Sequence, residues 1–383
     1  MAQANGVSAS PVSHYEDERW MKAALALGRR NLGVTWPNPS VGCILVRTED
    51  GKTTVIGRGT TAPGGRPHAE ICALTQAGGR AWGSTAYVTL EPCAHFGRTG
   101  PCALALIEAG IGRVVIGTTD PDSRVSGKGV RMMREAGIDV YAGVLEEECR
   151  QSHAGHICRV IRGRPTVHLK MAISADGFIG CREKGQVLIS SDRSWQLVHV
   201  MRSQSDGIVV GIGTVLADDP MLTCRIPGLE ERSPVRIVLD TRARLPLESQ
   251  LVKTAQDVPV FCLTGQGAEQ NRCEALVAAG VQVVEVPEDE DGHIALPLTL
   301  ARLAEFGLTR LMVEGGSRLA GAFAKKDLID EATFVFGSVN IGENGIAPLD
   351  DVSLDWFQDM RRFSEIDSGR LGGDKVVRYR RTR

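Results

Sequence analysis

The feature that most constrains this fold is an alternation of short apolar runs with helix-like segments, which stops near residue 150 and starts again after residue 164. Short apolar runs between turn-forming residues are typical of buried strands, and apolar residues three or four apart are typical of helices. The first series predicts strands over 41–46, 55–57, 86–90 and 114–117, with helices over 16–27, 68–76, 102–109 and 129–136. Strands that alternate with helices predict an α/β layered domain.

The second series predicts another α/β domain. Its strands are expected over 167–172, 207–211, 235–240, 258–263, 281–286 and 311–314, and its helices over 194–203, 273–279, 298–306 and 318–325. Residues 151–164 between the two series are polar and basic, so we expect a linker there. A chain of 383 residues is also too long for one ordinary core. We therefore expect domains over 14–150 and 165–383, and a disordered tail over 1–13.

Composition narrows the class of partner. The formal net charge is -2 and the pI is near 6.5, so no basic field covers the chain and long nucleic acid is not an expected partner. The sequence lacks an apolar run long enough to span a membrane and lacks the pattern of a leader peptide. Ten cysteines in such a chain indicate a reducing cytoplasm. A small anionic substrate stays compatible, because a few arginines bind one phosphate.

A zinc-binding pattern lies in the first domain. Glu70 follows His68 by two residues, and Cys93 and Cys102 come after one more helix and strand. A hydrolytic zinc ion takes three protein ligands and one water, and the histidine and two cysteines supply the three ligands. Zinc lowers the pKa of its water to about 7, and Glu70 can move a proton from that water without binding the metal. The pattern predicts one zinc ion per chain and a nucleobase-type deaminase.

Two other interpretations of these residues stay open. The site is structural if His95 is a fourth ligand, because structural zinc sites normally have four, or His68 and the cysteines are unrelated core residues. Glu70 and Pro92 favour the catalytic interpretation, because they complete the H-x-E and P-C arrangement of zinc deaminases. In that arrangement about two residues separate the cysteines. Here eight do, so residues 94–101 must loop out and return the chain to the metal.

With these residues the chain resembles the bifunctional deaminase/reductase family of riboflavin biosynthesis, from about Tyr15 onward. In the first domain the similarity rests on residues 37–43 (PNPSVGC), 68–70 (HAE) and 91–102 (EPCAHFGRTGPC). In the second domain it rests on residues 169–170, 174–177, 211–225 and 313–316. The resemblance implies an N-terminal cytidine-deaminase-like zinc domain followed by a C-terminal dihydrofolate-reductase-like domain that uses NADPH.

The resemblance further implies two reactions on one small phosphorylated pyrimidine. A diaminopyrimidinone carrying a ribosylamino 5′-phosphate loses its ring amine by hydrolysis, and the ribose is then reduced to ribityl by hydride from NADPH. In the first site His95 and Arg98 are expected to hold the phosphate, because arginine matches phosphate oxygens. The resemblance implies that Asn38 recognises the pyrimidine. An asparagine between two prolines fits an Asx turn equally well.

The resemblance also implies the ligand-binding residues of the reductase. Those expected at the second substrate are Lys170, Gln186, Arg202, Leu222, Arg225 and Glu314. Those expected at NADPH are Ile173, Leu188, Thr214, Asp218, Thr241, Gly316, Ser317, Arg318, Leu319, Ala320, Gly321 and Ala322. Lys170 and Asp218 are candidates for supporting proton transfer, although Asp218 with Asp219 also suits the capping of a turn.

Two local patterns bear on the cofactor. Residues 315–316 are both glycine, end a strand and open a helix, where backbone N–H groups can bind a pyrophosphate. Arg242 and Arg244 follow the strand that ends at Asp240. In other NADP-binding folds an arginine accommodates the 2′-phosphate, and the alternative for these two is an exposed turn.

Four residues depart from the family pattern. Phe96 stands where a second histidine is common, Gly100 where proline is common, Gln186 near a usual serine and Leu188 near a usual tryptophan. The last two leave open an alternative in which the second domain is degenerate and only mediates assembly. A deaminase of tRNA or DNA is disfavoured by the near-neutral charge, and a non-enzymatic zinc module by Glu70. A homo-oligomer is compatible with each interpretation.

Overall fold

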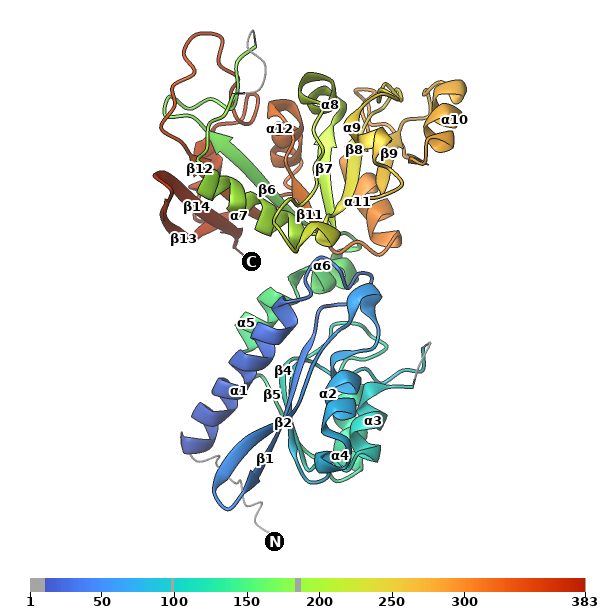
Figure 1. Cartoon of the computed structure of the whole chain (residues 1–383), viewed down its shortest axis with the longest axis vertical. Helices are drawn as coiled ribbons and strands as arrows, with labels where there is room; N and C mark the ends of the chain where they lie inside the picture. The colour runs from blue at the N-terminus through green and yellow to red at the C-terminus, as the bar shows by residue number, and fades with distance from the viewer. Residues whose placement is uncertain (1–10, 98–99, 183–186, 383) are drawn as a thin grey trace. The chain divides into compact units, whose positions relative to one another are not determined.

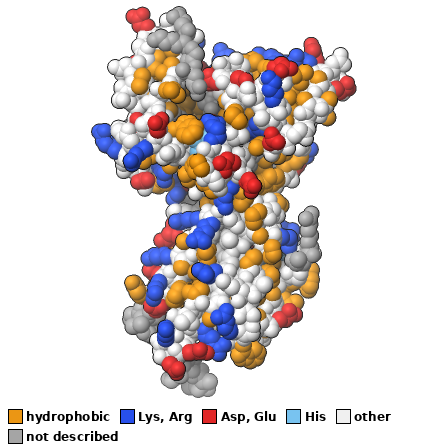
Figure 2. Space-filling view, viewed as in Figure 1, with side chains coloured by type: hydrophobic (Ala, Val, Ile, Leu, Met, Phe, Trp, Pro, Cys, Tyr) orange, Lys and Arg blue, Asp and Glu red, His pale blue; other side chains and the backbone are white. Residues whose placement is uncertain are grey.

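The computed structural model describes residues 11–97, 100–182 and 187–382 (Figure 1). Two of the expected site residues, Arg98 and Gln186, lie outside these ranges. The chain divides into two compact units, Met1–Arg162 and Gly163–Arg383. None of the helices within the described ranges is long and apolar enough to cross a membrane. On the face drawn in Figure 2, acidic and basic side chains are interspersed over each unit.

The first unit is built on a five-stranded sheet in the order β2-β1-β3-β4-β5. β1 runs antiparallel to β2 and β3, whereas β3, β4 and β5 run parallel. The strands are β1 (Gly42–Glu49), β2 (Lys52–Thr60), β3 (Thr85–Leu90), β4 (Arg113–Thr118) and β5 (Asp139–Ala142). The helices are α1 (Pro11–Arg29), α2 (Ala69–Ala77), α3 (Cys102–Glu108), α4 (Lys128–Glu135), α5 (Glu146–Ser152) and α6 (Ala154–Arg162). Helices cover both faces of this sheet (Figure 1).

Side chains along β1 alternate between two cores. Cys43 and Leu45 pack in the core that α2, α3 and α4 cover, whereas Ile44 and Val46 pack against α1. Successive side chains of a strand point to opposite faces, so a strand covered on both sides needs an unbroken apolar run. This requirement explains the apolar run at 41–46 from which the strand is predicted.

The second unit is built on a nine-stranded sheet in the order β10-β9-β8-β7-β11-β6-β12-β14-β13, parallel except at β14 and β13. Its strands are β6 (Thr166–Ile173), β7 (Gly207–Gly211), β8 (Val235–Leu239), β9 (Val260–Thr264), β10 (Gln282–Glu285), β11 (Arg310–Val313), β12 (Glu331–Phe336), β13 (Phe363–Leu371) and β14 (Asp374–Arg381). Its helices are α7 (Asp192–Ser203), α8 (Ile212–Asp218), α9 (Gln250–Lys253), α10 (Gln270–Ala278), α11 (Leu296–Glu305) and α12 (Ser317–Lys325).

The strand order of the second sheet reverses between β7 and β11. From β7 the chain moves outward through β8, β9 and β10, whereas β11 and β6 lie on the other side. In open parallel sheets, ligands bind outside the carboxyl ends of the strands at such a point. The loops after β7 and β11 therefore lie where the cofactor site is expected.

Several local expectations differ from the structure. Residues 151–164, expected as a linker, contain the end of α5 and the whole of α6, in which Gly155 and Cys158 are buried. Residues 11–13, expected in the tail, belong to α1. Four strands, β5, β12, β13 and β14, were not predicted. β13 is exposed along nearly its whole length, so it lacks the apolar run on which strand prediction depends.

Candidate active sites in the two units

His68, Cys93 and Cys102 come together at the ends of three elements of the first unit. His68 precedes α2, Cys93 follows β3, and Cys102 is the first residue of α3. The Nδ1 atom of His68 lies 3.7 Å from the sulfur of Cys93 and 3.3 Å from that of Cys102. All three ligand atoms lie within 4.8 Å of one another. Two sulfurs and one imidazole nitrogen are a donor set suited to zinc, so these residues fit that ion.

Among the described residues, this group of possible metal ligands has three members, and His95 is not a fourth. A three-ligand set leaves one position for water, as a hydrolytic zinc site requires. The backbone N–H of Cys102 donates to the sulfur of Cys93 over 3.3 Å. Side-chain hydrogen bonds from Cys102 and His68 lower the pKa of Cys93 to about 4. The cluster is thus prepared for a thiolate, the form in which cysteine binds metal.

Glu70 is buried in the first turn of α2, two residues after the histidine ligand. Burial is the main cause that raises its pKa to about 7. A carboxyl group with a pKa near neutrality can both accept and release a proton at the pH of a cell. Its carboxyl group also interacts with the side chain of Cys102, which places it beside the metal ligands without being one of them.

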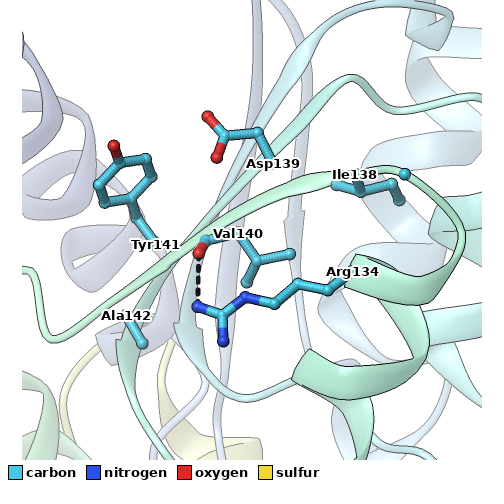
Figure 3. A pocket seen from close by; sticks show the side chains of 7 residues that line it. Arg134, Ile138, Asp139, Val140, Tyr141 and Ala142 are labelled. Carbon is cyan, nitrogen blue, oxygen red and sulfur yellow. Dashed lines mark hydrogen bonds between the residues drawn. The ribbon is translucent and has the colours of Figure 1, made fainter. Parts of the chain in front are cut away.

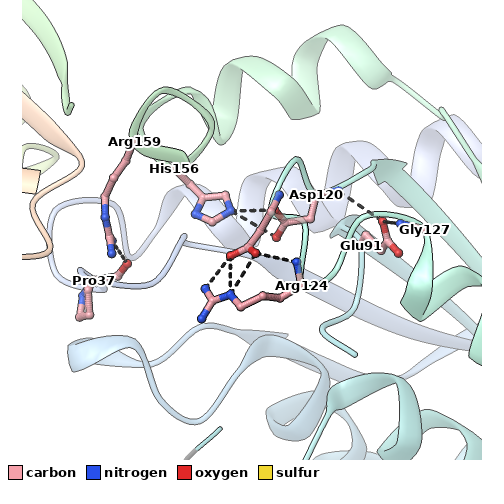
Figure 4. Close-up of polar contacts among 8 residues, drawn as sticks. Pro37, Glu91, Asp120, Arg124, Gly127, His156 and Arg159 are labelled. Carbon is pink, nitrogen blue, oxygen red and sulfur yellow. Dashed lines mark hydrogen bonds and ion pairs between the residues drawn. The ribbon is translucent and has the colours of Figure 1, made fainter. Parts of the chain in front are cut away.

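Glu91 holds the end of β3 in place through its buried carboxylate (Figure 4). The carboxylate accepts hydrogen bonds from the backbone N–H groups of Asp120, Gly127 and Val130, at 3.4, 3.1 and 3.3 Å. These contacts join the loop after β4 and the start of α4 to the strand that leads to Cys93. The sequence pattern contained Glu91 but gave it no role.

The helix α6, in the segment expected as a linker, contacts two loops of the first unit (Figure 4). The Nε2 atom of His156 lies 3.0 Å from a carboxylate oxygen of Asp120. Arg159 donates to the carbonyl oxygen of Pro37 over 2.7 Å. That proline precedes Asn38, so α6 fixes the loop that carries an expected substrate-binding residue.

Asn38 and His95, the two expected substrate-binding residues of the first unit that the structure describes, lie on loops next to the metal ligands. Asn38 donates through Nδ2 to the carbonyl of Gly65 over 2.8 Å, which ties its loop to the segment that leads into His68. The Nδ1 atom of His95 is buried and has no hydrogen-bond partner among the described residues. The sequence analysis did not identify Arg66. Its Nη2 atom would lie 3.4 Å from a Cβ atom built on Gly97, so this basic side chain borders the inserted loop of residues 94–101.

In the second unit Arg202 and Glu314 form a bidentate ion pair. Nε and Nη2 of the arginine each lie 2.8 Å from a different carboxylate oxygen, and Nη1 donates to the carbonyl of Thr223 over 3.0 Å. Burial opposes the charged form of Glu314, but the neighbouring Arg202 and Lys170 lower its pKa overall. Burial lowers the pKa of Lys170, and Glu314 partly opposes that shift. Three expected substrate-binding residues therefore lie in one charged group.

His199, a residue that sequence reasoning missed, holds the backbone of Arg225. The N–H of Arg225 donates to Nδ1 of His199 over 3.0 Å, so the proton of the neutral ring is on Nε2. The ring is fully buried, and burial together with the charges of Arg202 and Arg225 lowers its pKa to about 4. The ring of Trp195 packs edge-on against His199, and the guanidinium of Arg225 lies 5.2 Å from the centre of a Trp195 ring.

The expected pyrophosphate site lies at the start of α12. A Cβ on Gly316 would lie 3.7 Å from Oγ1 of Thr214, so the ends of β11 and β7 meet as the strand order implies. A Cβ on Gly315 would lie 2.6 Å from the side chain of Leu319, so a larger residue there would require that side chain to shift. Residues 315–316 and the start of the nine-residue helix α12 form a glycine cradle, whose backbone N–H groups can bind the pyrophosphate of a dinucleotide.

The other expected cofactor residues differ in exposure. Ile173, Ala320 and Gly321 are buried, Thr241, Ser317 and Ala322 are partly buried, and Leu188, Asp218 and Arg318 are exposed. Leu222, expected at the substrate, is buried with a φ of 55°. Asp219 accepts from the backbone N–H of Gln250, so it caps the start of α9 rather than a turn at Pro220. Both arginines after β8 face carboxylates, Arg242 that of Glu288 and Arg244 that of Asp240.

A hollow at the outer strand β5 contains none of the expected site residues (Figure 3). Its walls are the turn after α4 and the strand itself, and Arg134 donates to the carbonyl of Val140 over 2.8 Å. Because β5 pairs with β4 alone, this hollow lies at the edge of the sheet.

Two family models match the chain. The model for the cytidine and deoxycytidylate deaminase zinc-binding region matches residues 14–118, and that for the RibD C-terminal domain matches residues 165–368. The riboflavin biosynthesis protein RibD of Aquifex aeolicus is 37% identical over 365 residues, which cover 95% of this chain and 98% of the relative. The RibD protein of Escherichia coli is 37% identical over 327 residues, 82% of this chain and 86% of the relative.

Solved structures agree with these matches. Acinetobacter baumannii RibD superposes with a TM-score of 0.83 at 34% identity, covering 97% of this chain and 100% of that one. A diaminohydroxyphosphoribosylaminopyrimidine deaminase/5-amino-6-(5-phosphoribosylamino)uracil reductase from Thermotoga maritima gives a TM-score of 0.81 at 31% identity, with the same coverage. The expected pairing of a cytidine-deaminase-like domain with a reductase domain is thereby confirmed.

Proposed function

Because the chain belongs to the RibD family of riboflavin biosynthesis proteins, we propose that its two units act in turn on one phosphorylated pyrimidine. The first unit removes the ring amine of 2,5-diamino-6-(5-phosphoribosylamino)pyrimidin-4(3H)-one by hydrolysis. The second reduces the ribosyl group with NADPH and yields 5-amino-6-(5-phosphoribitylamino)uracil. The observation that carries this proposal is the His68, Cys93 and Cys102 cluster with Glu70 beside it. None of the comparisons favours a degenerate second unit.

In the deaminase site, one zinc ion per chain supplies a water whose pKa is low enough to release a proton near neutral pH. Glu70 accepts that proton as the water oxygen bonds to the ring carbon. It then donates the proton to the amine as the carbon–nitrogen bond breaks, so ammonia leaves. The second proton of the water moves to the neighbouring ring nitrogen, which leaves a carbonyl at the ring carbon. The raised pKa of Glu70 suits both transfers, because neither protonation state is strongly disfavoured.

We assign the recognition of the pyrimidine to Asn38 and that of the phosphate to His95 and Arg98. The contact between Asn38 and Gly65 supports the first assignment, because it keeps the loop of Asn38 beside the segment that enters α2. The buried, unpartnered Nδ1 of His95 supports the second, because a ligand oxygen would satisfy it.

In the reductase site, Arg225 holds the sugar phosphate, and Arg202 with Glu314 positions the ribose. NADPH supplies the hydride that adds to the sugar carbon. The reduction also consumes one proton, and Lys170 is our candidate to deliver it, because burial makes its ammonium group more acidic. The buried ion pair fixes the orientation of Glu314, so its carboxylate stays charged beside the sugar.

We place the pyrophosphate of NADPH at the start of α12 and its adenosine end toward the loop after β8. The glycine cradle next to Thr214 supports the first placement, and the position of Thr241 at the carboxyl end of β8 supports the second. We further propose that the enzyme works in the cytoplasm, because its ten cysteines are all free. A homo-oligomer is compatible with each of these steps.

Removal of the metal tests whether the two sites work independently. Dialysis against a chelator should stop deamination of the diaminopyrimidinone phosphate, and added Zn²⁺ should restore it. The same metal-free protein should still oxidise NADPH when it receives the deaminated substrate, because none of the proposed reductase groups is a zinc ligand. Loss of both activities on chelation would contradict the assignment of one reaction to each unit.

A further inference from the structure

An exposed ion pair lies at the carboxyl ends of the outer parallel strands of the second unit. Arg242 follows β8, and Glu288 follows β10. The Nη1 and Nη2 atoms of Arg242 lie 2.9 and 3.1 Å from the two carboxylate oxygens of Glu288. The arginine side chain is 50% exposed and the glutamate 20%, so solvent reaches the arginine more freely. A ligand can therefore reach this guanidinium from outside.

Two glycines in the loop after β9 make room for the pair. A Cβ on Gly265 would lie 2.2 Å from a carboxylate oxygen of Glu288, and one on Gly267 would lie 2.3 Å from Nη1 of Arg242. Any other residue at either position would displace the ion pair. The backbone N–H of Gly265 also donates to the carbonyl of Thr241 over 3.0 Å, so the loop holds the pair beside an expected cofactor residue.

This location is that of the cofactor's adenosine end, if the pyrophosphate occupies the cradle at α12. An arginine in such a place accommodates the 2′-phosphate that distinguishes NADPH from NADH. A guanidinium offers one planar fork to a carboxylate or to a phosphate. Here Glu288 already takes both arms of that fork.

We propose that Glu288 competes with the 2′-phosphate of NADPH for Arg242, so that this ion pair limits the preference of the enzyme for NADPH over NADH. The inference rests on the proposed cofactor site. Binding of NADPH requires the arginine to exchange a carboxylate for a phosphate, whereas binding of NADH leaves the pair intact. A stronger ion pair therefore lowers the affinity for NADPH and leaves the affinity for NADH unchanged.

Calorimetric titration with NADPH and NADH, in the absence of substrate, tests the proposal. Glu288→Gln should tighten NADPH binding about fivefold, within the range that an exposed ion pair contributes, and leave the Kd for NADH unchanged. Arg242→Gln should weaken NADPH binding and again spare NADH. In the Arg242→Gln background, the Glu288 substitution should change the NADPH Kd by less than about twofold, because the group it releases is gone.

Glu305→Gln is the matched control, because it removes a carboxylate from the exposed Arg302–Glu305 pair on α11 and changes the net charge equally. It should leave both Kd values unchanged. An unchanged NADPH Kd in Glu288→Gln would overturn the inference while leaving the cofactor site intact. Failure of the wild-type protein to bind either nicotinamide would overturn the proposed cofactor site and the inference together.

Discussion

The guanidinium of Arg202 and the carboxylate of Glu314 are 112 residues apart in the chain and meet through two contacts of 2.8 Å. Both side chains are largely buried, so each charge depends on the other for compensation. Lys170 lies within electrostatic reach and lowers the pKa of the same carboxyl group. Three of the expected substrate-binding residues thus belong to one charged group in the second unit.

Replacement of Glu314 by Gln should impair reduction and spare deamination. The change leaves Arg202 without its counter-charge and removes a charged acceptor from the sugar, and hydrogen bonds to charged groups contribute about 1.5–3 kcal/mol. We expect kcat/KM with the deaminated substrate to fall roughly ten- to a hundredfold. Steady-state oxidation of NADPH measures the loss, and the deaminase rate of the same preparation is the internal control. Normal reduction would show that this pair does not act on the substrate.

Cys93→Ala should lose the zinc ion. It removes one of three ligand atoms, and the remaining histidine and cysteine are one ligand short of the three that a hydrolytic zinc ion takes. Metal analysis of the purified variant measures occupancy. Cys273→Ala, on α10 of the other unit, is the matched control and should keep one zinc per chain. Full occupancy in Cys93→Ala would mean that the metal is held elsewhere.

Glu70→Gln should retain zinc and lose deamination. The amide has the size of the carboxyl group but cannot move a proton, and general acid–base groups contribute on the order of 10² to 10⁴ in rate. Release of ammonia follows the reaction, and metal analysis confirms that the site is intact. If the variant deaminated at a nearly normal rate, another group would have to carry the proton.

His199 should make the second unit sensitive to acid. Burial lowers its pKa from an ordinary value of 6.5 to about 4, so its contribution to stability is present above pH 6.5 and is lost as the pH falls toward 4. Protonation of Nδ1 also displaces the hydrogen bond from the N–H of Arg225. His199→Asn keeps an acceptor there and does not titrate, so its free energy of unfolding should fall less over this range. Parallel urea titrations that gave equal pH slopes would rule out this role.

The zinc site was predictable because its ligands belong to a short local pattern. His68, Glu70, Cys93 and Cys102 occupy the ends of consecutive elements, and chain order alone brings these ends together. Most strands that are buried on two faces were predictable for a related reason, since such burial leaves an unbroken apolar run. The buried strand β12 was missed nonetheless.

Contacts between distant segments were not predictable. Glu288 lies 46 residues from Arg242, and the local sequence around either residue does not predict that they pair. His199 lies in the middle of an amphipathic helix, where the sequence does not distinguish it from an ordinary core residue. The segment that forms α6 was predicted to be a linker, because its sequence is polar and basic. Its buried residues, Gly155 and Cys158, form only a narrow stripe.

The product formed from the diaminopyrimidinone phosphate tests the central claim most directly. The purified protein with bound zinc is incubated with this substrate, with and without NADPH, and the product mass is followed. Without NADPH, we expect the mass in which a carbonyl oxygen and its ring proton replace the amine. With NADPH, we expect two further hydrogen atoms on the same molecule. A product that stops at the deaminated mass in the presence of NADPH would contradict the claim that one chain carries out both steps.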